Sequence, residues 1–147
     1  MYKALAAGPG VLVEDTSLDV EGYNAGVNIR WLLASLTELL RTADAPVAPA
    51  AVWRVMFAVH HDNVMYVAQA EVKGHLVAEP RGTGFSFDAY FVPEGHDMTL
   101  GEMEAAGTKD LVSARKAAVT RLLAGHCRCL AVTEIPAWAG AFQAEAA

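Results

Sequence analysis

The sequence predicts a single domain of the mixed α/β class, residues 1–147, with a central mixed β-sheet flanked by helices. Its 147 residues are 54% hydrophobic and 19% charged, the composition of a folded globular chain that is long enough to bury about two thirds of its unfolded surface. Two runs rich in Val, Phe, Trp and Tyr, 52–60 and 64–72, are typical of strands. Apolar residues at helical spacing in 29–40 and 109–124 predict two helices.

The first elements are a short helix over residues 1–7, stopped by Gly8, and a short apolar run at 11–13. The run predicts an interior strand that ends in Glu14 and Asp15. Two carboxylates at the end of a strand suit Mg²⁺ coordination or a catalytic base. From the residues alone a solvated turn is the favoured interpretation, and the metal or base role is the alternative.

The middle of the chain predicts a helix capped by Asn28, a proline-containing linker and a β-hairpin. The two strands at 52–60 and 64–72 are joined by Asp62 and Asn63, a pair that favours a two-residue turn. Lys73-Gly74 predicts a second turn, followed by a third strand over 75–79.

An aromatic and charged stretch follows, and it offers the best candidate site. Phe85 and Phe87 can stack on a flat ring, at about 1–3 kcal/mol per nucleobase. Asp88, Lys109 and Arg115 would supply an acceptor and donors for the polar edge of that ring. The alternative is that Phe85 and Phe87, together with Phe91, are strand residues that point into the core.

The last predicted helix begins after Thr108 and ends at Gly125. Beyond it, Cys127 and Cys129 lie two residues apart, which predicts a plain strand with reduced thiols, as expected in the cytoplasm. The residues after 131 are rich in alanine and predict a short terminal helix.

Charge and hydropathy argue against two classes of partner. The net charge of −6 disfavours a protein that grips long nucleic acid through its phosphates. No apolar run reaches the roughly 18–20 residues needed to span a bilayer, so no membrane segment is expected.

The order of residues from 85 to 115 resembles the base-recognition half of the inosine/xanthosine triphosphate pyrophosphatase family. That family hydrolyses noncanonical purine nucleoside triphosphates to the monophosphate and pyrophosphate. The resemblance implies that the substrate-binding residues are Phe85, Phe87, Asp88, Lys109 and Arg115. The matching segments read Phe85-Ser86-Phe87-Asp88-Ala89, Phe91-Val92-Pro93-Glu94-Gly95, Thr99-Leu100-Gly101-Glu102-Met103, Thr108-Lys109-Asp110 and Ser113-Ala114-Arg115.

Residues 11–36 resemble the central block of the same family, in which a strand ends in two acids and a loop leads into a helix. By this resemblance Glu14 and Asp15 bind the catalytic Mg²⁺, and they orient or activate the attacking water. The family's glycine-rich loop is shortened here to Asn24-Ala25-Gly26.

The resemblance covers about residues 10–123 and leaves 124–147 as a C-terminal extension, so the expected fold is a truncated version of the family's. The family's N-terminal strand, with its phosphate-gripping loop, has no counterpart in residues 1–10. Ala114 stands where the family has a histidine that helps to read the purine 6-keto oxygen, which predicts a relaxed choice of base.

These observations favour Mg²⁺-dependent hydrolysis of noncanonical purine nucleoside triphosphates. The alternative is a catalytically inactive module that binds a nucleotide or another small molecule, and a purely structural role is the third possibility. Exposed sheet edges and apolar surface also predict self-association, as a homodimer.

Overall fold

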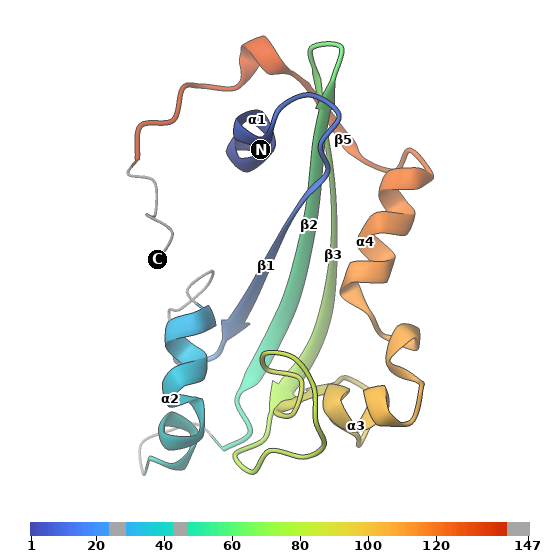
Figure 1. The fold of residues 1–147 in the computed structure, drawn as a ribbon. Coiled ribbons are helices and arrows are strands. Elements are labelled where there is room, and N and C mark those ends of the chain that lie inside the picture. The colour runs from blue at the N-terminus through green and yellow to red at the C-terminus, as the bar shows by residue number, and fades with distance from the viewer. Residues whose placement is uncertain (24–28, 43–46, 141–147) are drawn as a thin grey trace.

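The computed structural model describes residues 1–23, 29–42 and 47–140. The expected Asn28 cap and the shortened loop at 24–26 lie outside these residues. Within them, a twisted sheet runs the length of the molecule, with helices placed around it (Figure 1).

The sheet contains β1 (Val13–Val20), β2 (Ala50–His61), β3 (Val64–Leu76), β4 (Phe91–Pro93) and β5 (Arg128–Ala131). The strand order is β1-β2-β3-β4, and β5 pairs with the other end of β3. The α/β class is therefore confirmed. The expected mixture of parallel and antiparallel strands is not confirmed, because every strand pair of the described chain is antiparallel.

The hairpin between β2 and β3 forms where the sequence predicts it. Asp62 and Asn63 both have positive φ, 48° and 61°, the conformation of a type I′ turn, whose twist matches that of the strands it joins. His61 and Asp62 lie at this exposed tip, with 3.2 Å between Nε2 and Oδ2. The turn aligns β2 and β3 over twelve residue pairs, from Ala50↔His75 to His61↔Val64.

The predicted turn at Lys73-Gly74 is wrong, because β3 continues through both residues to Leu76. Gly74 is needed for a different reason. A Cβ built on it would lie 2.2 Å from the Val92 carbonyl oxygen and 2.8 Å from the Phe91 ring. The glycine therefore lets β4 and its phenylalanine approach the backbone of β3 closely.

The position of the first strand also differs from the prediction. Val11 and Leu12 are 44% and 46% exposed and precede β1, which begins at Val13. Within the described residues β1 pairs with β2 alone, so it is an edge strand of this sheet and not an interior one. As a result, Glu14 and Asp15 lie in the first residues of the strand, and their side chains point to opposite faces.

The helices are α1 (Tyr2–Ala7), α2 (Ile29–Arg41), α3 (Leu100–Ala105) and α4 (Ala114–Leu123), with 3₁₀ turns η1 (Lys109–Leu111) and η2 (Val132–Glu134). The single helix expected over 109–124 is divided into η1 and α4. Ser113 caps α4 by accepting a hydrogen bond from the Lys116 backbone N–H at 3.2 Å, and Thr108 makes no side-chain cap. Gly125, with φ 75°, ends α4 as expected.

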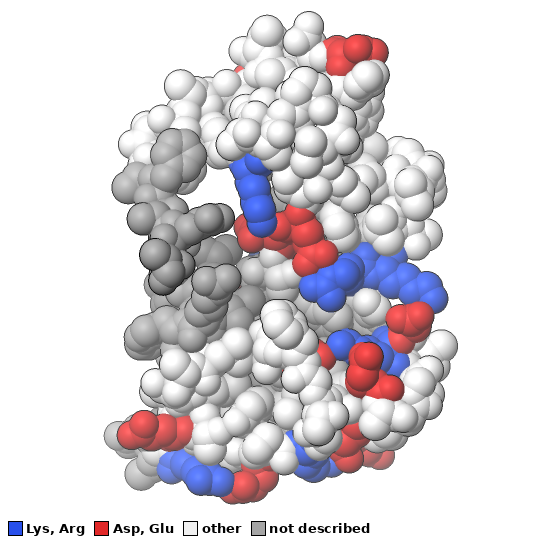
Figure 2. All heavy atoms as spheres, in the orientation of Figure 1, with Lys and Arg blue, Asp and Glu red and all other residues white. Residues whose placement is uncertain are grey.

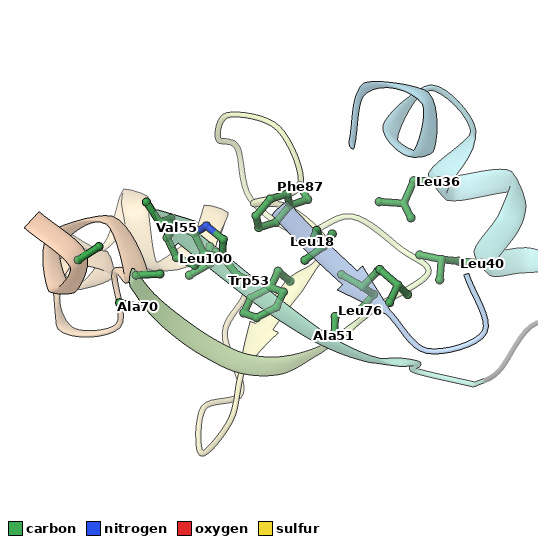
Figure 3. Close-up of a cluster of buried hydrophobic side chains, with 14 of the residues drawn as sticks. Leu18, Leu36, Leu40, Ala51, Trp53, Val55, Ala70, Leu76, Phe87 and Leu100 are labelled. Carbon is green, nitrogen blue, oxygen red and sulfur yellow. The ribbon is translucent and has the colours of Figure 1, made fainter. Parts of the chain in front are cut away.

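The main core lies on one face of the sheet and is closed by α2, α4 and the loop before β4. Figure 3 shows Phe87 and Trp53 beside Leu18, with Leu36 and Leu40 of α2 facing them. A smaller cluster on the other face packs Ala4 of α1 against β2 and β3. Among the described residues, no helix is long and apolar enough to cross a membrane.

Candidate functional site

A pocket of about 410 Å³ opens beside the main core. It brings together side chains from the strands β1 and β2, the helices α2 and α4, the 3₁₀ turn η1 and the loop before β4, segments up to about a hundred residues apart in sequence. Figure 2 shows acidic and basic side chains next to one another across the middle of this face. The lining residues are Glu14, Thr16, Leu33, Trp53, Phe85, Ser86, Phe87, Asp88, Lys109 and Arg115.

The loop that carries Phe85 to Asp88 is held by close backbone contacts with α3. The Gly101 N–H donates to the Asp88 carbonyl at 2.8 Å, and a Cβ on Gly101 would lie 2.5 Å from the Thr83 carbonyl oxygen. The buried Thr99 hydroxyl donates to the Arg81 carbonyl at 2.6 Å, and Thr99 also forms a capping box with Glu102. These contacts fix the loop on a rigid support, which is what a preorganised site needs.

The two predicted stacking rings occupy different environments. Phe85 is 84% exposed at the rim of the pocket, so its face is open to a ligand. Phe87 is 3% exposed and packs edge-on against Trp53, with 5.9 Å between ring centroids. Phe87 and Phe91 therefore belong to the core, as the alternative interpretation of the sequence had it. Phe87 still lines the pocket with one side, whereas Phe91 does not.

Asp88 and Lys109 form the most buried charge pair of the pocket. The Lys109 Nζ donates to Asp88 Oδ2 at 2.6 Å and lies 3.2 Å from Glu104 Oε2. Asp88 Oδ2 also accepts from the Phe85 backbone N–H at 3.3 Å. Burial alone would lower the pKa of the Lys109 ammonium, but hydrogen bonds and charge from Asp88 and Glu104 outweigh it and raise that pKa. Lys109 is therefore a fixed cation at neutral pH.

Glu14 and Arg115 form a second pair at the pocket. Arg115 donates from Nε and Nη2 to the two carboxylate oxygens of Glu14, at 2.7 and 2.8 Å. The Thr16 hydroxyl donates to Glu14 Oε1 at 3.1 Å, and Lys3 Nζ donates to the Glu14 backbone carbonyl at 2.6 Å. The hydrogen bonds from Arg115 lower the pKa of the Glu14 carboxyl despite its partial burial, and Thr16 and Lys3 lower it further.

Asp15 is the one predicted site residue that the structure does not bring to the pocket. It is exposed on the opposite face of β1. That face is polar here, and on it Asp19 pairs with Arg54 at 2.8 Å. The other predicted site residues, Glu14, Phe85, Phe87, Asp88, Lys109 and Arg115, all line the pocket.

The donor set does not match a magnesium site within the described residues. Mg²⁺ is bound through carboxylates that keep free oxygens, together with water or substrate phosphates. Glu14 already shares both carboxylate oxygens with Arg115, and Asp15 lies on the other face of the strand. No group of three or more His, Cys, Asp or Glu side chains in the described chain is arranged to hold a metal ion.

Four lining residues were not predicted from the sequence: Thr16, Leu33, Trp53 and Ser86. Thr16 follows Glu14 by two positions, so the two-residue period of a strand was a signal that both face the same side. Ser86 has a positive φ of 63°, and its place follows from the turn that exposes Phe85. Leu33 and Trp53 reach the pocket only through tertiary packing, for which the local sequence has no signal.

The fold and the pocket together define a class of protein. It is an α/β protein with an antiparallel sheet, whose pocket combines an exposed aromatic ring with fixed cations and carboxylates, features that suit a flat polar ligand. A family model described as the Ham1 family matches residues 1–125, and the chain belongs to this family. The resemblance to the inosine/xanthosine triphosphate pyrophosphatases is thereby confirmed.

Two relatives illustrate the sequence similarity. A dITP/XTP pyrophosphatase of Porphyromonas gingivalis is 32% identical over 121 residues, which are 82% of this chain and 58% of the relative. One of Caulobacter vibrioides is 51% identical over 59 residues, 40% of this chain and 30% of the relative. The chain thus spans little more than half the length of the first relative and less of the second.

Solved structures support the same fold. A HAM1 protein from Coxiella burnetii superposes with a TM-score of 0.70 at 22% identity, over 85% of this chain and 73% of that one. The Staphylococcus aureus Ham1 protein gives a TM-score of 0.67 at 19% identity, over 85% of this chain and 70% of the other.

Proposed function

We propose that this chain binds noncanonical purine nucleoside triphosphates in the pocket and acts in their hydrolysis to monophosphate and pyrophosphate. The observation that carries the proposal is the pocket itself. Phe85, Asp88, Lys109 and Arg115, the residues implied by the family resemblance, meet there from three separate segments. The pyrophosphatase names of the relatives support the reaction.

The chemistry of the pocket suits a 6-keto purine such as hypoxanthine. Phe85 offers an exposed face for stacking, which is worth about 1–3 kcal/mol per base. A 6-keto purine presents an acceptor at O6 and a donor at N1, and these complement the ammonium of Lys109 and the carboxylate of Asp88. The Asp88 carboxylate is held by the Phe85 backbone N–H and by Lys109, and the ammonium is held by Asp88 and Glu104, so little side-chain ordering is required on binding.

Magnesium dependence remains a prediction that rests on the family resemblance. The chemistry that such an ion would supply is neutralisation of the phosphate charge. The residues described here bind and orient the base, and within them no complete metal site is formed. A carboxylate such as Asp15 would need ligands from elsewhere to contribute.

The same observation favours a second candidate, a binding module that retains the base pocket without hydrolysis. Glu14 is neutralised by the bidentate contact with Arg115 and has no free carboxylate oxygen for a further role. In this case a nucleotide would still bind through Phe85 and Asp88, but it would dissociate without being hydrolysed.

The deciding experiment measures pyrophosphate release from inosine, xanthosine and ordinary nucleoside triphosphates in the presence of Mg²⁺. The wild type is compared with Asp88→Asn and Asp15→Asn. We expect turnover of the inosine and xanthosine substrates that falls in Asp88→Asn, and a loss in Asp15→Asn would assign a catalytic role to that residue. Inosine nucleotide binding without turnover would establish the binding module, and the absence of both would refute the proposed ligand class.

Self-association as a homodimer and a cytoplasmic location are further predictions. The edge strand β1 and the exposed side chains of Leu111 and Leu123, 79% and 83% accessible, are the features that favour association. Light scattering coupled to size exclusion would contradict the dimer by showing a monodisperse monomer at micromolar concentration.

A further inference from the structure

The pair formed by Glu14 and Arg115 determines what Glu14 can do. Both carboxylate oxygens accept a hydrogen bond from the same guanidinium, at 2.7 and 2.8 Å. This bidentate geometry is the strongest and most directional form of an arginine–carboxylate contact. Thr16 adds a third hydrogen bond to Oε1 at 3.1 Å. The carboxylate is thus already satisfied by three donors from the chain itself.

The charges around Glu14 oppose the binding of a further cation such as a metal ion. Arg115 and Lys3 both lower the pKa of the Glu14 carboxyl, and Lys3 Nζ lies 2.6 Å from the Glu14 carbonyl oxygen. Two positive charges therefore flank one carboxylate. The nearest carboxylate in sequence, Asp15, points to the other face of β1 and is not positioned to share a metal ion with Glu14.

The same pair leaves Arg115 prepared to meet a ligand. Arg115 uses Nε and Nη2 for Glu14, and among the residues that the structure describes no partner is bonded to its Nη1. Arg115 lines the pocket on the side of Asp88, whose charge contributes to the raised pKa of the Arg115 guanidinium. An arginine is a long side chain with much rotamer freedom, and a fixed carboxylate partner removes that freedom before the ligand binds.

From these contacts we infer that Glu14 is a positioning residue, which holds the Arg115 guanidinium toward the ligand, and is not a ligand of a metal ion. The inference rests on the proposed function for the identity of the ligand, a purine nucleotide. It differs from the expectation drawn from the family resemblance, in which Glu14 coordinates Mg²⁺.

The first test measures the affinity of inosine triphosphate by calorimetry in the presence of a chelator, so that no divalent metal contributes. The proteins are the wild type, Glu14→Gln, Arg115→Gln and the double variant. Glu21→Gln is the matched control, because Glu21 lies just beyond β1 and is exposed. In the described part of the chain its carboxylate accepts from the Ala50 backbone N–H alone, at 3.2 Å. Thermal melts establish that each variant is folded.

A positioning role predicts that Glu14→Gln weakens metal-free binding about fivefold to tenfold, the order expected when one long side chain must be immobilised by the ligand itself. The double variant should bind no more weakly than Arg115→Gln alone, because Glu14 acts through Arg115. Glu21→Gln should bind as the wild type does. An unchanged affinity in Glu14→Gln, or additive losses in the double variant, would overturn the inference.

The second test needs no nucleotide, so it separates this inference from the proposed function. Mn²⁺, a paramagnetic substitute for Mg²⁺, is titrated into the wild type while backbone amide signals are followed by NMR. We expect no selective broadening at Glu14 and Thr16. Selective broadening there at substoichiometric Mn²⁺, lost in Glu14→Gln, would make Glu14 a metal ligand and overturn the inference, whether or not inosine triphosphate binds.

Discussion

Replacing Asp88 with asparagine should lower the stability of the chain markedly, because it removes the charge that compensates a largely buried lysine. The Asp88 and Lys109 side chains are only 7% and 21% exposed, and their charged atoms lie 2.6 Å apart. Asparagine keeps the size of the side chain and an oxygen for the Phe85 N–H. The substitution therefore isolates the loss of charge.

The magnitude follows from the remaining contacts of Lys109. Loss of one partner of a buried pair costs about 3–5 kcal/mol, but Glu104 at 3.2 Å continues to offset the ammonium charge. We therefore expect a loss of about 2 kcal/mol, close to the value of one charged hydrogen bond. For a chain of this size that corresponds to a fall in Tm of about 4–8 °C.

The assay is chemical and thermal denaturation followed by circular dichroism. Asp110→Asn is the matched control, since Asp110 faces Lys116 at 3.5 Å with both side chains mostly exposed, and it should cost at most about 0.5 kcal/mol. Combining Asp88→Asn with Lys109→Met should cost less than the sum of the single changes. Equal effects of Asp88→Asn and Asp110→Asn would refute the reasoning.

Three further predictions concern the ligand, the sheet and pH. Phe85→Ala should change stability by less than about 0.5 kcal/mol, since the ring is 84% exposed, but should weaken inosine nucleotide binding by about 1–3 kcal/mol in calorimetry; unaltered affinity would exclude stacking. Gly74→Ala should destabilise the fold by about 1–3 kcal/mol in urea, because the new methyl meets the Val92 carbonyl, and a neutral result would mean that β4 moves freely. The Glu14 pKa is lowered in the folded state, so its stabilisation is present above the ordinary value near 4.5 and is lost as the pH falls through the folded pKa. Arg115→Gln should flatten this acid dependence in melts from pH 6 to about pH 3, and a slope unchanged from the wild type would contradict it.

Local signals predicted the elements that depend on local interactions. The leucines of 29–40 recur at helical spacing, and α2 occupies 29–41. The Asp62-Asn63 turn follows from the tolerance of these residues for positive φ. Both features are set by residues that are neighbours in sequence, so a single sequence is sufficient to find them.

The predictions from the sequence are wrong where contacts between residues distant in sequence determine the structure. Gly74 has the sequence signature of a turn, but the approach of β4 keeps it inside a strand. The pairing of Glu14 with Arg115 joins residues separated by 101 positions. The family resemblance predicted that both are site residues, with Glu14 bound to a metal ion and Arg115 bound to the base. Their mutual contact appears only when the chain is folded.

The environment of Ala114 constrains any attempt to redesign base preference. Ala114 is fully buried against the sheet at the start of α4, immediately before Arg115. An imidazole introduced there would have to displace core side chains, an overpacking that typically costs about 1–3 kcal/mol, and it would disturb the helix turn from which Arg115 reaches Glu14. Engineering of selectivity should therefore begin at Ser86 and Thr16, which line the pocket without supporting the core.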